Sequence, residues 1–323
     1  MKFLKSFVLI GLFLASTISF AQNQPSIQSQ KKVVKINPVK ADTNNPDKKQ
    51  LKKYSKEEMY KTIFPDKKIT DPKEQQAMDL YNAGCKKGMA GDYPGAISDY
   101  TKSLNIIKNV NTYVKRGYSY MMQSNYPSAI ADANEAIKLE PNFAKAYFVR
   151  GLSKFETKDY AGAEQDLAKS IEIDHSNAIA FNYMAALKFM KQDFRAALSN
   201  YDEVVKLDPK YSDIYTNRGM MRHYLQDYNG AIQDYNEALK TNPNNASAYN
   251  NRAAGKMMLK DFKGALADLD KAITLKKDYA DAFDNRGRVK QALGDVSGAC
   301  ADWNMAYSLG IDASKNLIIK YCK

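Results

Sequence analysis

The sequence predicts an all-α fold, a right-handed superhelical solenoid of about seven helical hairpins followed by a C-terminal capping helix. Three features repeat in phase about every 34 residues and carry this prediction. An Asp/Asn–aromatic dipeptide places its second residue at positions 93, 126, 160, 194, 228, 262 and, as valine, 296. A small residue recurs as Gly84, Gly117, Gly151, Ala185, Gly219, Ala253 and Gly287, and an alanine as Ala96, Ala129, Ala163, Ala197, Ala231, Ala265 and Ala299. A fixed period of this length indicates stacked hairpins that each bury an apolar face against a neighbour.

An aromatic residue stands four places before the small residue in six of the units, and Leu80 takes that place in the first. These aromatic residues are Tyr113, Tyr147, Phe181, Tyr215, Tyr249 and Phe283. Together with the small residue and the alanine, they resemble the tetratricopeptide repeat (TPR) over roughly residues 77–310. The resemblance implies a helix–turn–helix unit that binds protein or peptide partners in a concave groove. The usual proline after the second helix is present only as Pro141, Pro209 and Pro243, and its loss elsewhere weakens a helix boundary without changing the fold.

The chain departs from the family pattern just before the small residue, where five units carry arginine instead of leucine. These residues are Arg116, Arg150, Arg218, Arg252 and Arg286. The second helix of the same units carries Asp132, Asp166, Asp234, Asp268 and Asp302 at a matching place. In the fourth unit both change together, to Met184 and Asn200, although the first unit has Asp99 with Ala83. The joint change favours a structural ion pair within each hairpin over a basic binding stripe. We expect part-exposed pairs, which contribute about 0–1 kcal/mol each.

Residues 1–21 have the features of a secretory signal peptide. Two lysines precede an apolar stretch over 6–20, and Ser19 and Ala21 are small residues at the spacing that signal peptidase needs. The stretch is short for a transmembrane helix. We therefore expect export, with a mature chain that begins at Gln22 and lies in the periplasm, is secreted or stays at the cell surface. A retained N-terminal anchor is the alternative.

Residues 22–74 form a separate basic region rich in Asn and Lys, with 13 Lys against 7 Asp and Glu. Its low apolar content predicts a disordered linker, in which residues 55–64 have the pattern of a short helix. With the two signal lysines, it holds eight of the twelve excess positive charges and leaves +4 for residues 75–323. Nucleic-acid binding needs a basic stripe on a folded face, so no nucleic-acid partner is expected. A solvated spacer, or attraction to an acidic envelope surface, explains the charge better.

Two of the three cysteines are predicted to form a disulfide that holds a capping helix over residues 313–322. The turn near Gly310 leaves about ten residues back to Cys300 and about ten on to Cys322, so the two sulfurs sit level in antiparallel helices that rise about 1.5 Å per residue. An oxidising compartment would allow the bond to persist. Cys85 is then left as a free thiol.

No catalytic motif is recognisable. The chain has two histidines, His175 and His223, no His/Cys/Asp cluster with metal-ligand spacing and no Gly-rich phosphate loop. We therefore expect no enzyme activity, no cofactor and no metal site.

The TPR resemblance places six positions of each first helix toward the concave groove. The predicted partner-binding residues at these positions are Tyr118, Met121, Met122, Phe148, Leu152, Phe155, Tyr183, Phe189, Met190, Asn217, Asn250 and Asn251. Units two to four are aromatic and Met-rich, which suits an adaptable contact surface. The alternative is that these apolar residues pack against the neighbouring repeat. Tyr81 and Cys85 occupy the places of a carboxylate clamp in the first unit, so no such clamp is expected.

The sequence therefore predicts an exported TPR scaffold that binds a protein or peptide in the cell envelope, with no membrane span once the signal is removed. A glycan- or peptidoglycan-binding solenoid is one alternative, because Asn217, Asn250 and Asn251 could bind sugars. A self-assembling structural protein is another.

Overall fold

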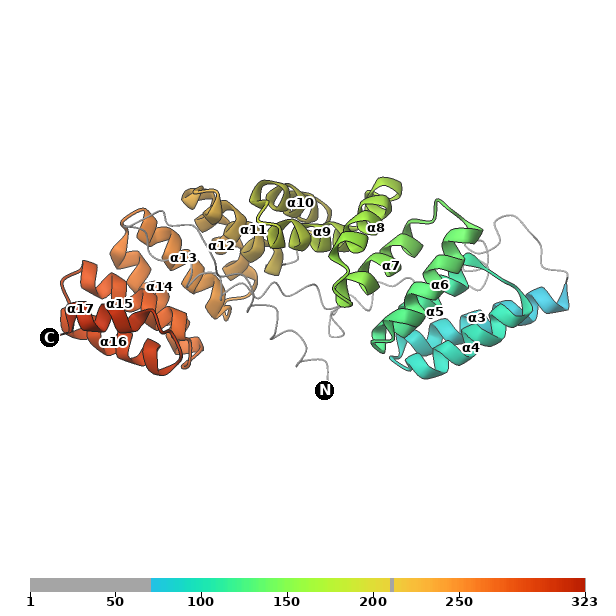
Figure 1. Cartoon of the computed structure of the whole chain (residues 1–323), viewed down its shortest axis with the longest axis horizontal. Coiled ribbons are helices and arrows are strands. Elements are labelled where there is room, and N and C mark those ends of the chain that lie inside the picture. The colour runs from blue at the N-terminus through green and yellow to red at the C-terminus, as the bar shows by residue number, and fades with distance from the viewer. Residues whose placement is uncertain (1–70, 210–211, 323) are drawn as a thin grey trace. The chain divides into compact units, whose positions relative to one another are not determined.

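The computed structural model describes residues 71–209 and 212–322. The predicted signal peptide, the 55–64 helix and residues 22–70 of the linker lie outside these ranges. Within them the chain forms fifteen α-helices and no strand, which confirms the all-α prediction (Figure 1). Residues 71–208 make one compact unit and residues from 209 onward make another. They are called here the N-terminal unit and the C-terminal unit.

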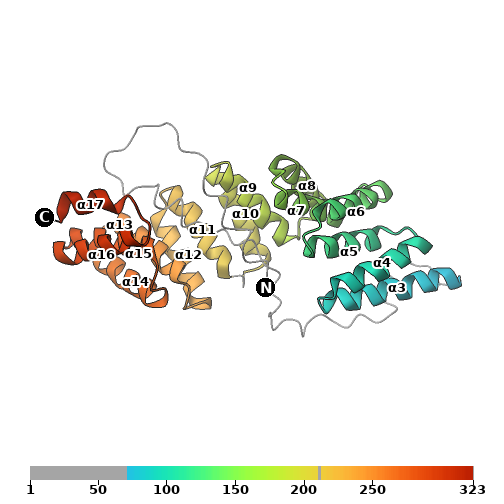
Figure 2. The same ribbon diagram turned by 60° about the horizontal axis from the view of Figure 1, so that its bottom comes forward.

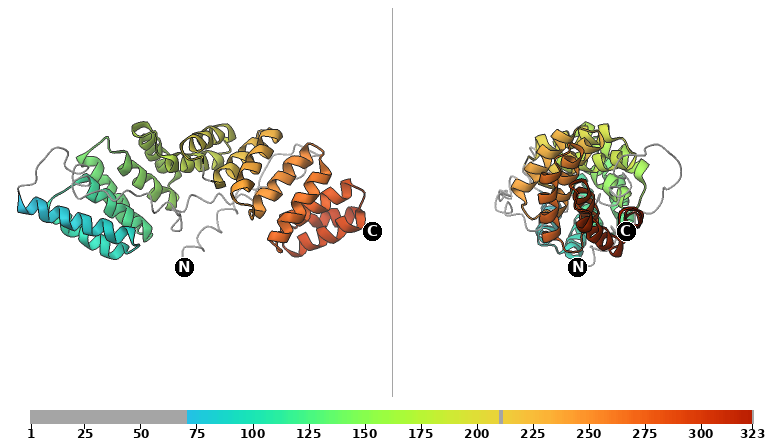
Figure 3. Two further views of the ribbon diagram at one scale, coloured as in Figure 1. Left: turned by 180° about the vertical axis from the view of Figure 1, so that it is seen from behind. Right: turned by 90° about the vertical axis from the view of Figure 1, so that its left-hand side faces the viewer.

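The N-terminal unit consists of four helical hairpins, seen from behind in the left view of Figure 3. The helices pair in chain order: α3 (Pro72–Met89) with α4 (Tyr93–Ile106), α5 (Val110–Met122) with α6 (Tyr126–Leu139), α7 (Ala144–Glu156) with α8 (Tyr160–Ile173), and α9 (Ala178–Met190) with α10 (Phe194–Leu207). Helix α3 begins at Pro72, capped by the Asp71 side chain, and so starts three residues before the predicted solenoid boundary at 75.

The C-terminal unit consists of three further hairpins and a terminal helix. They are α11 (Ser212–Tyr224) with α12 (Tyr228–Thr241), α13 (Ala246–Met258) with α14 (Phe262–Leu275), α15 (Ala280–Ala292) with α16 (Val296–Ser308), and then α17 (Ser314–Tyr321). Helix α17 packs against α16, as Figure 2 shows, and occupies the place of the predicted capping helix. The seven hairpins and the capping helix agree with the repeat count expected from the sequence.

The repeating Asp/Asn–aromatic dipeptide marks the start of every second helix. The Asp or Asn side chain is the N-cap and accepts a hydrogen bond from the backbone N–H three residues on, as Asp159 does from Gly162 at 3.0 Å. The residue before each cap has a positive φ, for example 67° at Lys158 and 83° at Gly91. This left-handed residue turns the chain, and the cap then satisfies a helix-terminal donor, which contributes about 1 kcal/mol per repeat.

The small residue and the alanine of each repeat lie where the two helices of a hairpin cross. A Cβ on Gly84 would stand 2.6 Å from Cε1 of Tyr100, and one on Gly287 would stand 2.5 Å from Nε1 of Trp303. The alanines of the second helices are fully buried, Ala163 and Ala265 among them. Larger side chains at either place would push the helices apart, which explains the strict phase of both series.

The predicted ion pairs are present in all five hairpins that carry them, and they do more than expected. Arg150, for example, donates from Nε and Nη2 to the two carboxylate oxygens of Asp166, at 2.8 and 2.6 Å. Its Nη1 reaches Asn134 on the second helix of the preceding hairpin, at 2.7 Å. Arg252 binds Asn236 in the same way. The arginine therefore joins neighbouring hairpins as well as the two helices of one hairpin.

These pairs are also less exposed than the part-exposed pairs that we expected from the sequence. The aspartate side chains are only 2–6% exposed. Each arginine also lies over the aromatic ring of its own repeat, at 5.3–5.7 Å from the ring centroid. The pairs therefore belong to the core, where losing one partner costs far more than at the surface.

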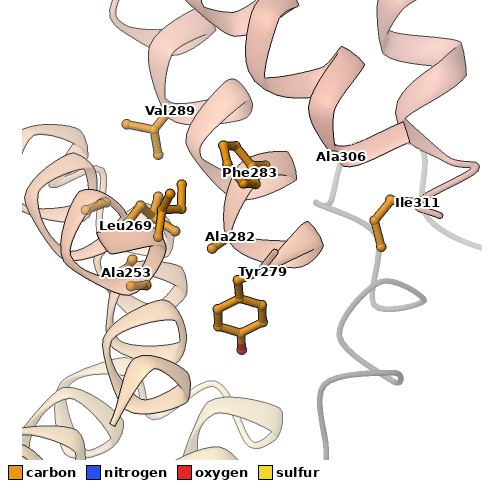
Figure 4. Packing of buried hydrophobic residues seen from close by; sticks show 11 residues of the cluster. Ala253, Leu269, Tyr279, Ala282, Phe283, Val289, Ala306 and Ile311 are labelled. Carbon is orange, nitrogen blue, oxygen red and sulfur yellow. The ribbon is translucent and has the colours of Figure 1, made fainter. Parts of the chain in front are cut away.

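The apolar core continues from hairpin to hairpin within each unit. Figure 4 shows part of it in the C-terminal unit, where Ala253, Leu269, Phe283 and Val289 pack together from α13, α14 and α15. The faces of the first helices that these contacts do not cover remain accessible to form a site.

Candidate functional site

Seven of the nine predicted apolar binding residues keep part of their surface accessible in the N-terminal unit. They come from α5, α7 and α9 and are called here the N-terminal patch: Tyr118, Met121, Met122, Phe148, Phe155, Phe189 and Met190. Met190 is the most exposed of them, at 39%. Contacts with the apolar core hold these residues in place. Met121 packs against two successive core clusters, and Phe148 and Phe155 pack against the second cluster, which joins α7, α8 and α9.

The other two apolar residues, Leu152 and Tyr183, are buried, with only 6% and 9% of their surface exposed. Both belong to the core cluster that joins α7, α8 and α9. The expectation that their side chains face the groove does not hold in this structure, because the neighbouring helix covers them. Phe155 lies edge-on to Tyr183, with ring centroids 5.2 Å apart, so the buried ring of Tyr183 packs against the patch residue Phe155.

One polar residue of the patch region was not among the predicted binding residues. Glu156 ends α7 and is half-buried. Burial raises the pKa of the Tyr126 and Tyr160 phenols, and the nearby charge of Glu156 raises both further. Burial raises the pKa of the Glu156 carboxyl itself. It stands at one of the six positions expected to face the groove, and every other repeat has an uncharged residue at that place.

The three predicted asparagines of the C-terminal unit do not form an open polar row. Asn217 and Asn250 are buried, with 7% and 3% of their surface exposed, while Asn251 is half-buried. Asn250 donates to Asn251 at 3.3 Å and accepts from Asn285 at 2.9 Å. The amides of Asn250 and Asn285 therefore join neighbouring first helices, and the expected exposure of Asn217 and Asn250 is not found.

The histidines show no catalytic arrangement. Burial lowers the pKa of His223 to about 4, and its ring stands edge-on to Tyr228 with centroids 5.1 Å apart. His175 is exposed and stacks edge-on against Phe181. Across residues 71–209 and 212–322, no three His, Cys, Asp or Glu side chains are grouped as metal ligands. No helix in those same ranges is both long and apolar enough to span a membrane.

Two shallow cavities open on the second-helix side at equivalent places of different repeats. The larger, about 680 Å³, is lined by α5, α6 and α7 and includes Arg116, Glu135 and Arg150. The smaller, about 430 Å³, includes Glu237 and Arg252. Their charged groups already bind one another or the neighbouring helix, so these cavities follow from the repeating ion pairs.

Cys300 of α16 and Cys322, just after α17, form a disulfide with their Cα atoms 5.7 Å apart. This is the pairing expected from the sequence. The ring of Trp303 on α16 also contacts Tyr321 of α17, at 5.7 Å between centroids. Cys85 is unpaired and half-buried beside Tyr81 and Tyr100.

Comparisons with known proteins agree with this architecture. Two family models, both described as tetratricopeptide repeat, match residues 114–178 and 212–245. Bacteriophage adsorption protein A of Escherichia coli K12 is 43% identical over 47 residues, which are 15% of this chain and 5% of that protein. The chain thus spans only a small part of that relative.

Solved structures with the same fold cover more of the chain. The C-terminal part of a TPR protein from Cytophaga hutchinsonii has a TM-score of 0.56 at 16% identity, over 75% of this chain and 98% of that one. Pseudomonas aeruginosa PilF has a TM-score of 0.55 at 17% identity, over 66% and 97%. YrrB, described as a TPR protein with an unusual peptide-binding site, has 0.54 at 20% identity, over 57% and 95%. With the seven hairpins and the two family matches, this shared fold identifies the chain as a tetratricopeptide repeat protein.

Proposed function

We propose that this protein is an interaction scaffold whose N-terminal patch binds a segment of a partner protein in the cell envelope. TPR proteins are generally non-catalytic scaffolds for protein–protein interaction. The observation that carries the proposal is the patch itself, seven apolar side chains on three successive first helices that the hairpin cores leave partly uncovered.

The physical argument is desolvation. Single exposed apolar residues are ordinary, but a set gathered on adjoining helices marks a contact surface. Burying it stabilises a complex by roughly 25 cal/mol per Å² of apolar area, before ordering costs. Phe148, Phe155 and Phe189 are the natural anchors, because rigid aromatic side chains carry most binding energy in such surfaces. The methionines beside them adapt to the shape of the partner.

The envelope location rests on the N-terminal sequence and on the cysteines. Residues 1–21 have the features of a signal peptide, and the Cys300–Cys322 disulfide suits an oxidising compartment. N-terminal sequencing of the protein from its native cells should find Gln22 first. An intact Met1 would contradict export through a cleaved signal.

Among known folds, YrrB supports a peptide-binding role by analogy only, since an identity of 20% carries the fold alone. The glycan-binding alternative gains nothing from the asparagines, because Asn250 is already bound on both sides by Asn251 and Asn285.

The test replaces Phe148 and Phe189 singly with serine and measures both the melting temperature and capture of partners from envelope extract. Exposed Met89, at 70% exposure on α3, is changed to serine as the control outside the patch. Capture should fall for the two patch variants while both stay folded, with some loss of melting temperature for Phe148→Ser because Phe148 packs on the hairpin core, and should persist for Met89→Ser. Equal capture by all variants would place the binding surface elsewhere.

A further inference from the structure

One place in the repeat distinguishes the third hairpin from all the others. The last position of its first helix carries Glu156, whereas the equivalent residues elsewhere are Met89, Met122, Met190, Tyr224, Met258 and Ala292. A charged residue therefore stands where the other hairpins use uncharged side chains. The two nearest equivalents, Met122 and Met190, are themselves members of the N-terminal patch.

The surroundings of Glu156 offer it aromatic rings and no cation. Tyr126 begins α6 and Tyr160 begins α8. Burial raises the pKa of both phenols, and the charge of Glu156 adds to this rise. The rings of Phe155 and Tyr160 meet edge-on, with centroids 5.6 Å apart. No ion pair to Glu156 occurs among the described residues.

Three lysines at the ends of α7 and α9 are engaged with other acids. Lys154 binds Asp166 at 2.8 Å, and Lys188 binds Glu164 at 2.7 Å. Glu164 also receives Lys191. The third hairpin thus leaves one half-buried carboxylate without a counter-charge.

Such a carboxylate costs folding free energy. Partial burial removes water from the charged group, and no ion pair offsets the loss. The methionine that the neighbouring repeats use would avoid this cost. Glu156 is unfavourable for the free protein, and it lies at the edge of an apolar contact surface. A ligand that supplies the missing cation would explain why a carboxylate stands there.

We infer that the N-terminal patch selects a partner segment that places a lysine or arginine between apolar side chains, with Glu156 receiving the cation. The inference rests on the proposed function of the patch and adds the chemistry of its ligand. Met122 and Met190, at the same position of the preceding and following hairpins, would contact the apolar residues on either side.

The experiment uses two matched sets of fluorescent synthetic peptides. In the first set a single lysine is flanked by two apolar residues on each side, and in the second set glutamine replaces the lysine. Anisotropy titrations measure both sets against the full chain, Glu156→Gln and Glu140→Gln. Glu140 is an exposed acid just after α6, so its variant loses the same charge away from the patch.

The unchanged protein should bind the lysine set about tenfold more tightly than the glutamine set. Glu156→Gln should reduce that preference to about twofold or less while still binding both sets, and Glu140→Gln should keep it. Glu156→Lys should reverse the preference toward peptides with glutamate in place of lysine.

The contrary outcomes separate the two proposals. Equal affinity for both sets, weakened by Phe148→Ser, would overturn the role of Glu156 and leave the patch as a binding surface. A preference for lysine that survives Glu156→Gln would do the same. Binding of neither set would overturn both proposals. A concentration-dependent dimer in light scattering that Glu156→Gln dissolves would replace the separate partner by a second copy of this chain.

Discussion

At the scale of single residues, the sequence period predicted which positions lie on the first helices, but it did not predict how exposed their side chains are. Tyr118 and Leu152 stand at the same first-helix position of successive hairpins, directly after the small residue, yet only Leu152 is buried. The period fixes the direction of a side chain around its helix. How far the next helix covers that direction depends on the side chains of both helices, which one repeat does not reveal.

Glu156 gives the first prediction at this scale. Because its pKa is raised above the usual 4.5, the folded state holds its proton more strongly than the unfolded state. Its contribution to stability is therefore most favourable below about pH 4.5 and is lost as the pH rises through the raised value. Glu156→Met should raise the Tm by about 2–4 °C at pH 7, and the gain should shrink toward pH 4. A gain that is independent of pH, measured by circular dichroism, would count against an uncompensated carboxylate.

His223 gives the opposite pH dependence. Burial lowers its pKa from 6.5 to about 4, so the unfolded state binds the proton more strongly between these values. Stability contributed by the neutral ring is complete above pH 6.5 and declines as the pH falls toward 4, by up to about 3 kcal/mol. Urea unfolding of His223→Phe should show a flatter decline over this window. The exposed His175→Gln variant should behave as the unchanged protein, and identical slopes in all three would refute the assignment.

At the scale of the elements, the phase of the hairpins could be read from the sequence, whereas contacts between hairpins could not. The Asp/Asn–aromatic dipeptide recurs once per hairpin, and the structure shows that its first residue caps the second helix through a local interaction. The link from Arg150 to Asn134 was missed, since it depends on how one hairpin rotates against the next.

The fourth hairpin, which lacks the arginine–aspartate pair, suggests how the other pairs can be tested. Arg252→Met should cost about 1.5–3 kcal/mol, because Asp268 would lose two charge-assisted hydrogen bonds and keep only Lys256 beside it. Adding Asp268→Asn recreates the combination that the fourth hairpin carries as Met184 and Asn200, and should recover much of the loss. Chemical denaturation of the single and double variants measures the coupling. Equal losses in both would show that the loss does not come from an Asp268 carboxylate left without its arginine.

The capping helix depends on the disulfide and on one ring contact. The Cys300–Cys322 bond closes a loop with a sequence separation of 22, for which the chain-entropy model gives about 3 kcal/mol. Replacing both cysteines with alanine should expose the amides of α17 and α16 to hydrogen exchange before those of α13. Thiol counting on the denatured, unreduced protein should find one free thiol, at Cys85; three would show that the bond does not form.

At the scale of the whole molecule, the hairpins of the two units carry different features. The N-terminal unit holds the complete patch, from Tyr118 to Met190, while the C-terminal unit ends in the capped helix. Since each repeat contacts only its neighbours, changes at the cap should leave the patch intact. Peptide affinity measured before and after reduction of the disulfide should therefore be equal. A strong loss of affinity on reduction would mean that the two units act together.

The central claim is that the N-terminal patch contacts a partner protein in the cell. It is tested most directly by placing a photo-crosslinking amino acid at Met190, on the patch, or at Glu172, exposed on α8 away from it. After irradiation of living cells, mass spectrometry identifies any crosslinked species. The account predicts a discrete crosslinked protein from position 190, reduced by Phe148→Ser and absent from position 172. The same species from both positions, or none from 190, would contradict it.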